Sequence, residues 1–267
     1  MLELEFAELT DVGRVRDHNE DYLGHVAPET PALARSHGWL FALADGVGGQ
    51  EKGEVASSTV VDSMVAGFRN APAGEQQSNL LPRLVREAST RVFEAALAGG
   101  RHTAGMATTL VACVLRNDRV AVSHVGDSRC YLIRRGEVSQ LTRDHTVANE
   151  QVRLGLVSAQ EAAAGSNTHL LSRSIGAEMV ANVDSSDHQV FPGDVLLLCS
   201  DGLHVSVTGS EMAAVCGSDS DLDSAAHKLV DLAKLRDGSD NISVLLIRVR
   251  AVERMGMYRG RPYKLPG

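Results

Sequence analysis

The stretch ALADGVGGQEKGEVAS, residues 42–57, joins the end of an apolar run to a cluster of glycines and then to a helical pattern. The residues GWLFALA, 38–44, are typical of a short buried strand. Residues 53–68 then repeat apolar side chains at four-residue steps, which predicts a helix with one buried face. Asp45 therefore stands where a buried strand ends, on a backbone that the following glycines leave free to bend.

Downstream of this stretch the apolar pattern predicts a second helix and then a group of strands. The helix is expected over residues 81–95, after Ser78 and Asn79 and before Gly99 and Gly100. From residue 107 onward, turn residues separate four strand-like runs, which predict an antiparallel meander. The four runs are ATTLVACVLR, RVAVSHVG, RCYLIRR and EVSQL.

Two more strands and a third helix complete the pattern. The strands GDVLLLCS (193–200) and NISVLLIRV (241–249) lie on either side of a helix whose apolar face runs from Leu222 to Ala233. Strands that are buried against outer helices imply layers. We therefore expect an α+β fold, a four-layer αββα sandwich of two mainly antiparallel sheets flanked by helix pairs, with residues 1–250 as a single domain.

Composition excludes several classes of protein. The chain has 267 residues and a formal net charge of −8, which argues against a nucleic-acid partner. No apolar run approaches the roughly 20 residues of a membrane span, and the start MLELEFAELT has acids where a secretory signal needs basic residues. We therefore expect a cytoplasmic protein without a membrane span. Its four cysteines are scattered singly, which favours reduced core residues over disulfides or a zinc site.

Six carboxylates lie at ends of expected strands. They are Glu20, Asp21, Asp45, Asp127, Asp201 and Asp240. A single aspartate before a glycine is most often a turn residue, but carboxylates that converge in one cleft repel one another unless cations neutralise them. Carboxylates and main-chain carbonyls are the hard oxygen ligands that suit Mg²⁺ or Mn²⁺. Gly46 can turn its carbonyl toward such an ion, and Gly48 and Gly49 permit the turn into the next helix.

Seven short motifs occur in order over about residues 5–250. They are RDHNED (16–21), ADGVGG (44–49), GMATTL (105–110), VGDSRCYLIR (125–134), LTRDHT (141–146), SDGL (200–203) and DNISVLLI (240–247). In this order and spacing the chain resembles the metal-dependent protein serine/threonine phosphatases of the protein phosphatase 2C family, in a compact bacterial form. The resemblance implies the same sandwich of sheets and helices.

The resemblance also implies a role for each acid. Asp45 matches a ligand that bridges two Mn²⁺ or Mg²⁺ ions, and Gly46 matches a carbonyl ligand of one of them. Asp201 and Asp240 match ligands of the other ion, while Glu20 and Asp21 match the acids that hold the second ion or its waters. Asp127 resembles the acid that binds a third, weaker ion together with Asp201.

Two further residues are assigned through the same resemblance. Arg16 matches the arginine that grips the substrate phosphate, and a planar guanidinium can donate two hydrogen bonds to one phosphate. Asn241 is expected to support the ligands from behind. The implied reaction is hydrolysis of phosphoserine or phosphothreonine through attack by a hydroxide that bridges the two ions, without a phosphoenzyme.

One departure from the family pattern concerns the proton donor. Some members have a histidine directly after the Asp-Gly pair, whereas this chain has Val47. The group that protonates the leaving oxygen is therefore open between a metal-bound water and His145, and a lone histidine is more often a structural hydrogen-bonder.

Two segments fall outside the motifs. Residues 142–172 correspond to a variable flap beside the cleft, which we expect to help select substrates. Residues 251–267 form a basic C-terminal segment without a core pattern, and a solvated tail is favoured there over a docking element for an acidic partner.

Three functions from different classes fit these features. The first is a phosphatase that acts on phosphorylated proteins and opposes a bacterial serine/threonine kinase. The second is a non-catalytic module that binds phosphoproteins, which the complete set of expected ligands disfavours. The third is a phosphatase of anti-sigma-factor switches, which the RDHNED segment disfavours. A monomer is expected in each case.

Overall fold

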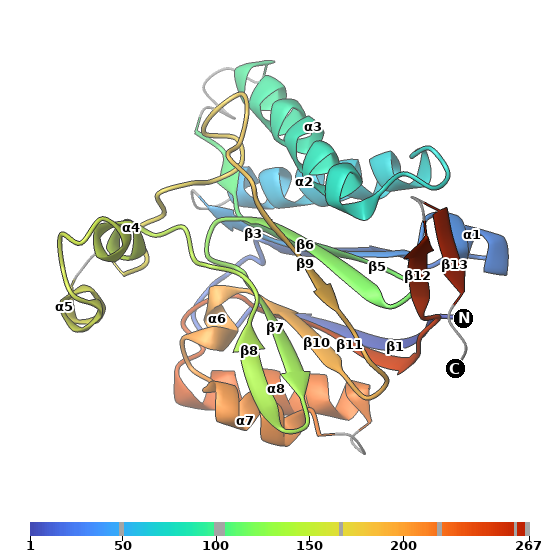
Figure 1. Ribbon diagram of the computed structural model, residues 1–267. Helices are drawn as coiled ribbons and strands as arrows, with labels where there is room; N and C mark the ends of the chain where they lie inside the picture. The colour runs from blue at the N-terminus through green and yellow to red at the C-terminus, as the bar shows by residue number, and fades with distance from the viewer. Residues whose placement is uncertain (48–50, 99–104, 166–167, 218–220, 259–260, 265–267) are drawn as a thin grey trace.

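Two antiparallel sheets stack face to face and carry helices on their outer surfaces (Figure 1). The computed structural model describes residues 1–47, 51–98, 105–165, 168–217, 221–258 and 261–264. The predicted α+β sandwich with flanking helices is confirmed, since α2 and α3 cover one sheet and α7 and α8 cover the other (Figure 1).

The first sheet has the strand order β2-β3-β5-β6-β9, with the short β4 paired to β3. All its pairings are antiparallel. Its strands are β2 (Asp21–Val26), β3 (Trp39–Val47), β4 (Ala107–Thr108), β5 (Leu110–Arg116), β6 (Arg119–Val125) and β9 (Asp184–Gln189).

The second sheet has the order β1-β11-β10-β7-β8 and is also antiparallel. Its strands are β1 (Glu3–Asp11), β7 (Arg129–Arg134), β8 (Glu137–Gln140), β10 (Val195–Cys199) and β11 (Ile242–Ala251). The central strands β10 and β11 are apolar almost throughout because both of their faces are buried.

Among the helices, α2, α3, α7 and α8 pack against the sheets through their apolar faces. The helices are α1 (Pro31–Ser36), α2 (Glu51–Arg69), α3 (Gln77–Ala98), α4 (Val147–Arg153), α5 (Ala159–Ala164), α6 (Asp201–His204), α7 (Gly209–Val215) and α8 (Leu222–Arg236). In α2 the residues Ala56, Val60, Met64 and Phe68 are all buried, as predicted. Helix α3 begins at Gln77, slightly before the expected start, and the predicted stop at Gly99 and Gly100 lies outside the described residues.

Three hydrophobic clusters fill the spaces between the four layers. One lies between the first sheet and helices α2 and α3, another between the second sheet and helices α7 and α8, and the third between the two sheets. The four cysteines are buried and free of disulfides, as predicted. Cys113 and Cys130 lie between the sheets, and Cys199 and Cys216 lie in the cluster under α7 and α8.

The predicted four-stranded meander is wrong. Strands β5 and β6 pair in the first sheet, whereas β7 and β8 pair in the second. The turn between β6 and β7 therefore carries the chain from one sheet to the other. Gly126 makes this crossing with φ of 105°, a conformation that favours glycine. Asp127 comes directly after it, so the crossing brings that carboxylate to the place where the two sheets meet.

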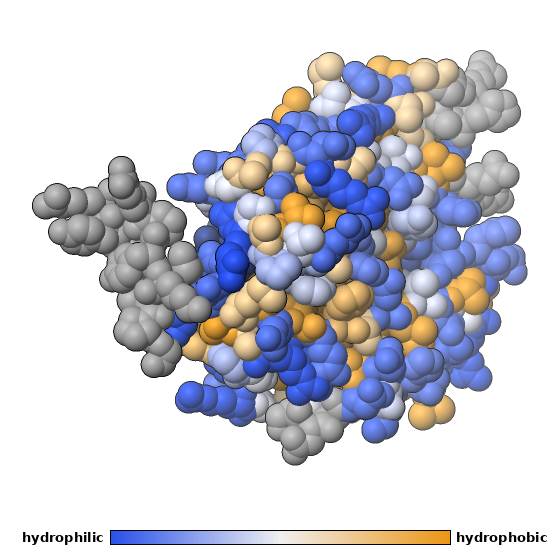
Figure 2. All heavy atoms as spheres, turned by 90° about the vertical axis from the view of Figure 1, so that its right-hand side faces the viewer, coloured by the Kyte–Doolittle hydropathy of each residue, from blue (hydrophilic) through white to orange (hydrophobic). Residues whose placement is uncertain are grey.

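The C-terminal segment differs from the expected tail. Residues Met255–Tyr258 (β12) and Arg261–Lys264 (β13) pair as an antiparallel two-stranded sheet. This hairpin lies at the end of the sandwich where β1 begins (Figure 1). Figure 2 shows that polar side chains cover most of that end of the molecule and that hydrophobic side chains lie in small groups between them. None of the helices in the described ranges has the length and apolar character needed to cross a bilayer.

Candidate functional site

A pocket of about 250 Å³ lies where ends of strands from both sheets meet. Seven of the predicted site residues line it: Arg16, Glu20, Asp45, Gly46, Asp127, Asp201 and Asp240. Val47, Thr109, His169 and Leu171 complete the lining. The other two predicted residues do not line it, but Asp21 pairs with Asp45 in the sheet and Asn241 accepts a hydrogen bond from Glu20 N–H. The structure therefore brings together acids that are more than 200 residues apart in the chain.

The pairing of β2 with β3 places three of these residues. Asp21 lies directly opposite Asp45 in the register of the two strands. The Gly46 N–H donates to the carbonyl of Glu20 at 3.1 Å, so Glu20 is held beside the same end of β3. Because β2 begins where β3 ends, two separate stretches of sequence deliver three carboxylates to one edge of the sheet.

The threonines of GMATTL fix the backbone of Asp45. Thr109 N–H and the Thr108 hydroxyl both donate to the Asp45 carbonyl at 2.8 Å. The Asp45 N–H donates in turn to Thr109 Oγ1 at 3.0 Å. The main-chain polar groups of Asp45 are thus satisfied by the neighbouring strand, which leaves its side chain to face the pocket.

Gly46 is required by a close approach of β3 to α2. A Cβ at this position would lie 2.4 Å from backbone atoms of Gly53, and a Cβ on Gly53 would lie 2.9 Å from the Glu20 carboxyl carbon. Any larger residue at either position would push α2 away from the pocket. The expected roles of Gly48 and Gly49 lie outside the described residues.

Asp240 and Asn241 connect the start of β11 to the loop that carries Arg16. Arg16 forms a 2.8 Å ion pair with Asp240. The Asn241 amide accepts from Glu20 N–H at 2.8 Å and donates to the carbonyls of Val12 and His18 at 3.0 Å. One side-chain amide therefore holds the loop at three points.

Asp201 and Asp127 come from the second sheet and from the crossing between the sheets. Asp201 begins α6 directly after β10, and the preceding Ser200 donates its hydroxyl to Asp21 at 2.8 Å. Asp127 is buried, and its main-chain carbonyl lies 3.1 Å from His204 Nε2. Ser200, which precedes Asp201, thus connects the end of the second sheet to Asp21 of the first sheet through a hydrogen bond.

Crowding raises the pKa of the buried acids. Burial, with the charges of Asp201 and Asp240, raises the pKa of Asp21 to about 7. Burial, followed by the charge of Asp201, raises the pKa of Asp127 to about 7. The pKa of Asp45 lies well above its usual value because of burial and the charges of its acidic neighbours. Each charge in this pocket therefore destabilises the others until a cation neutralises them.

Three buried carboxylate oxygens in this site show that its residues suit a metal ion. Glu20 Oε1, Asp21 Oδ1 and Asp201 Oδ1 are buried and have no hydrogen-bond partner among the described residues. A buried charged oxygen without a partner is costly, so such oxygens call for a ligand. Since all the acidic donors are hard oxygens, the site fits Mg²⁺ or Mn²⁺ rather than a softer metal.

Two histidines change the expectation for the proton donor. His145 is fully buried and does not line the pocket, so the structure argues against it as a donor to the leaving oxygen. His169, which the sequence analysis did not single out, does line the pocket. A lone histidine in a polar segment gives no sequence signal of this kind, because its place depends on how residues 142–172 fold back.

Comparison with known proteins gives a consistent result. A family model described as protein phosphatase 2C matches residues 15–231. The serine/threonine phosphatase Stp of Listeria innocua is 33% identical over 255 residues, which cover 94% of this chain and 96% of that protein.

Two solved structures extend the similarity to the fold. The crystal structure of the Mycobacterium tuberculosis serine/threonine phosphatase PstP superposes with a TM-score of 0.81 at 31% identity, covering 94% of this chain and all of that one. A structure of the PstP catalytic domain in complex with two manganese ions gives a TM-score of 0.77 at 32% identity, with 94% and 100% coverage. The relative in that structure binds two manganese ions.

Proposed function

We propose that this chain, which belongs to the protein phosphatase 2C family and is a protein serine/threonine phosphatase, carries out its reaction in the acidic pocket between the two sheets. The observation that carries the proposal is the set of five carboxylates and one arginine around a single pocket. Phosphoryl transfer needs charge neutralisation and positioning more than covalent chemistry, and this lining offers both.

Most of the acids would hold two Mn²⁺ or Mg²⁺ ions. We assign Asp45 and the Gly46 carbonyl to the ions directly, Asp201 and Asp240 to one ion, and Glu20 and Asp21 to the other ion or its waters. The unpartnered oxygens of Glu20, Asp21 and Asp201 support this assignment. When bound, such a pair of ions activates water for attack on phosphorus and neutralises the developing charge.

Asp127 would hold a third, weaker ion together with Asp201. It reaches the pocket from the crossing between the sheets, and the charge of Asp201 contributes to its raised pKa. An ion with few protein ligands keeps most of its waters and binds weakly. The residue is therefore assigned to the rim of the cluster rather than to its centre.

Arg16 would bind the phosphate of the substrate. Its side chain is 46% exposed, and among the described residues its guanidinium pairs with one carboxylate oxygen, that of Asp240, at 2.8 Å. An incoming phosphate can therefore take up the remaining donors without removing Arg16 from a buried position. Replacing Arg16 with alanine should raise KM for phosphopeptides, while Mn²⁺ affinity measured by calorimetry stays near that of the wild type.

His169 would protonate the leaving oxygen. Val47 carries no proton, arginine does not release one, and the carboxylates are assigned to metal, so the candidates are His169 and the metal-bound water that the sequence left open. Among the described lining residues, His169 alone is an imidazole, a group that can act as a general acid toward a leaving oxygen. The His169→Gln variant should lose turnover of phosphoserine peptides and retain hydrolysis of p-nitrophenyl phosphate, whose leaving group needs no proton. Equal loss on both substrates would contradict this role.

The remaining assignments concern biological context. We propose that the chain acts as a monomer in the cytoplasm on phosphorylated proteins, that it opposes a bacterial serine/threonine kinase, and that nucleic acid is not a partner. Residues 142–172, with α4 and α5 projecting beside the sandwich (Figure 1), are proposed as a substrate-selecting flap. Two of its residues, His169 and Leu171, lie in the pocket lining, which supports that role.

The experiment that tests the central proposal measures Mn²⁺-dependent hydrolysis of phosphoserine and phosphothreonine peptides by the purified protein. We expect chelation to abolish activity and Asp201→Asn to do the same while the protein stays folded. Asp187→Asn is the matched control, because Asp187 lies on β9 in an exposed ion pair with Arg119. Full activity of Asp201→Asn, or activity that survives exhaustive chelation, would contradict the proposal.

A further inference from the structure

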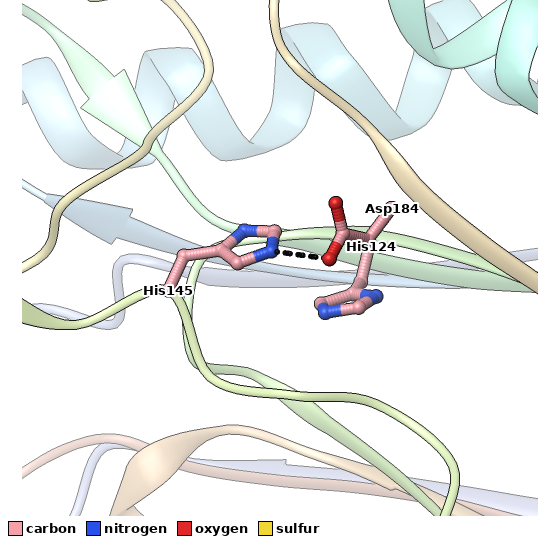
Figure 3. Close-up of side chains that lie close together, drawn as sticks. All are labelled: His124, His145 and Asp184. Atoms are coloured by element: carbon pink, nitrogen blue, oxygen red, sulfur yellow. Dashed lines mark ion pairs between the residues drawn. The ribbon is translucent and has the colours of Figure 1, made fainter. Parts of the chain in front are cut away.

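A second group of titratable side chains lies outside the pocket. His124, His145 and Asp184 place one ligand atom each within 4.8 Å of one another (Figure 3). These residue types can bind a metal ion, but Asp184 already forms ion pairs with two arginines. Arg173 pairs with its Oδ1 at 2.9 Å and Arg143 with its Oδ2 at 3.5 Å. Because cations surround the carboxylate, another cation would be repelled, and the cluster needs a different explanation.

The hydrogen bonds of His145 define its tautomer. Its Nδ1 accepts the Gly126 N–H at 3.1 Å, so Nδ1 carries no proton. Its Nε2 faces Asp184 Oδ2 at 3.2 Å, as Figure 3 shows, and Arg173 Nη1 lies 3.3 Å from the same nitrogen. Because a guanidinium cannot accept a hydrogen bond, the Nε2 proton is donated to Asp184. The ring is fully buried and stacks on His124 at 4.7 Å between centroids. Asp184 thus keeps the proton on Nε2 and leaves Nδ1 free to accept.

Gly126 is held by His145 at both of its main-chain groups. While Nδ1 accepts the Gly126 N–H, the His145 N–H donates to the Gly126 carbonyl at 2.9 Å. On the other side, a Cβ on Gly126 would lie 2.7 Å from Thr109 Cβ, and Thr109 Oγ1 lies 2.6 Å from the Ser128 hydroxyl. The turn that presents Asp127 is therefore fixed from two sides, and His145 is one of them.

His145 also supports the segment that contributes Leu171 to the pocket lining. Its carbonyl accepts the Ser172 N–H at 2.8 Å, and the Val147 N–H donates to the Leu170 carbonyl at 2.8 Å. These bonds flank a bridge between Thr146 and Leu171. One buried histidine thus contacts both the turn before Asp127 and the segment that contains Leu171.

We propose that His145 is a positioning residue for Asp127: its Nδ1 holds the Gly126 turn, and Asp184 keeps the ring in the tautomer that allows this. The inference rests on the proposed role of Asp127 at the acidic pocket. It assigns His145 no contact with substrate or metal. Its effect is to keep one carboxylate aimed into the pocket.

Two substitutions separate the two ring nitrogens. In His145→Asn the amide oxygen can take the place of Nδ1 and accept from Gly126, whereas the contact with Asp184 is lost. In His145→Gln the amide nitrogen can reach toward Asp184, whereas the acceptor for Gly126 is lost. A role that is merely structural predicts similar damage from both, since each removes one buried hydrogen bond.

The positioning role predicts different damage. We expect His145→Gln to lower kcat for phosphopeptides by roughly tenfold and to raise the Mn²⁺ concentration needed for half-maximal turnover, as loss of a supporting hydrogen bond does at metal sites. His145→Asn should lose less than about threefold. In an Asp127→Ala background, His145→Gln should cause no further loss, because the residue it positions is gone.

Contrary outcomes are equally specific. Equal losses in the two variants, or losses that multiply with that of Asp127→Ala, would overturn the inference. If both variants fail to fold, nitrogen NMR of the Mg²⁺-loaded wild type decides, since a proton on His145 Nδ1 would also overturn it. Wild-type hydrolysis of p-nitrophenyl phosphate is measured in parallel, so that failure of the proposed function is seen separately.

Discussion

In the acidic pocket, carboxylates from both sheets face one another with buried oxygens that no described side chain partners, whereas in the His124–His145–Asp184 cluster both carboxylate oxygens have partners. In the pocket, neighbouring acids raise the pKa of Asp45. In the cluster, Arg173 and His145 lie beside Asp184, and its pKa is lowered. The difference shows which buried charges the fold has neutralised and which it leaves for a ligand. A group that is complete within the chain stabilises the fold, and an incomplete one binds something.

The largest effect that separates the two groups is on activity. Asp45→Asn should lower Mn²⁺-dependent hydrolysis of p-nitrophenyl phosphate by about a thousandfold, equivalent to ~4 kcal/mol of transition-state stabilisation. Asp184→Asn, which removes a charge from the complete group, should lose less than about tenfold. Steady-state kinetics on folded proteins checks both values. Comparable losses in the two variants would erase the distinction.

The next effect is stabilisation by metal. Mn²⁺ at 100 times its dissociation constant should stabilise the wild type by about 2.7 kcal/mol, because only the folded chain assembles the carboxylates. The Asp45→Asn protein should gain much less, and Asp184→Asn should gain as much as the wild type. Thermal melts with and without chelator measure this. Equal shifts in all three proteins would mean that Mn²⁺ binds elsewhere.

A smaller effect is a difference of sign in the metal-free protein. Asp201→Asn should raise the free energy of unfolding by about 1 kcal/mol, since it removes repulsion among buried acids. Asp184→Asn should lower it by about 1 kcal/mol, since it weakens the ion pairs that Asp184 forms with Arg173 and Arg143. Urea unfolding in chelator gives both numbers. Destabilisation by Asp201→Asn would show that its carboxylate is already satisfied within the chain.

A separate effect is on the pH dependence of stability. The pKa of Asp127 is raised to about 7 in the folded chain, so the fold favours its protonated form. That contribution is fully present below the unfolded pKa near 4 and is lost as pH rises through 7. Metal-free wild type should therefore lose stability relative to Asp127→Asn between pH 4 and pH 7. A constant difference between the two proteins would contradict the raised pKa.

Two histidines change the stability of the wild type with pH in the opposite direction to Asp127. Burial lowers the pKa of both His145 and His204 to about 4. A histidine with a lowered pKa contributes stability above its unfolded pKa of about 6.5, and this contribution is lost as pH falls through 4. The wild-type curve alone would mix the two trends, whereas the difference from Asp127→Asn isolates the acid.

The sequence predicted the acid cluster better than it predicted the path of the chain. Strand ends at Asp45, Asp201 and Asp240 could be recognised because buried strands are apolar and stop abruptly. The crossing at Gly126 could not, since two adjacent strands with a short turn look the same whether they pair or pass to another sheet. Tertiary packing decides between these, and local pattern does not.

Two strands show a different limit. Strand β9 reads DSSDHQ and has no apolar face, so its pairing with β6 left no periodic signal. Strand β1 alternates only partly because it is half-buried at the edge of its sheet. His169 was missed for a related reason, since its place in the pocket depends on a polar segment that folds back. The charged residues that approach from loops are therefore the least predictable part of the site.

The four buried cysteines can report how often the layers of this sandwich open. Burial raises the pKa of the Cys216 thiol to about 12 and raises that of the others as well, so all four remain protonated at neutral pH. The thiolate is the nucleophile that reacts with alkylating reagents, and a protonated thiol enclosed in a core is inert. Labelling can then proceed only when a layer opens. The labelling rate of Cys113 and Cys130 therefore reports separation of the two sheets. The labelling rate of Cys199 and Cys216 reports separation of helices α7 and α8 from the second sheet.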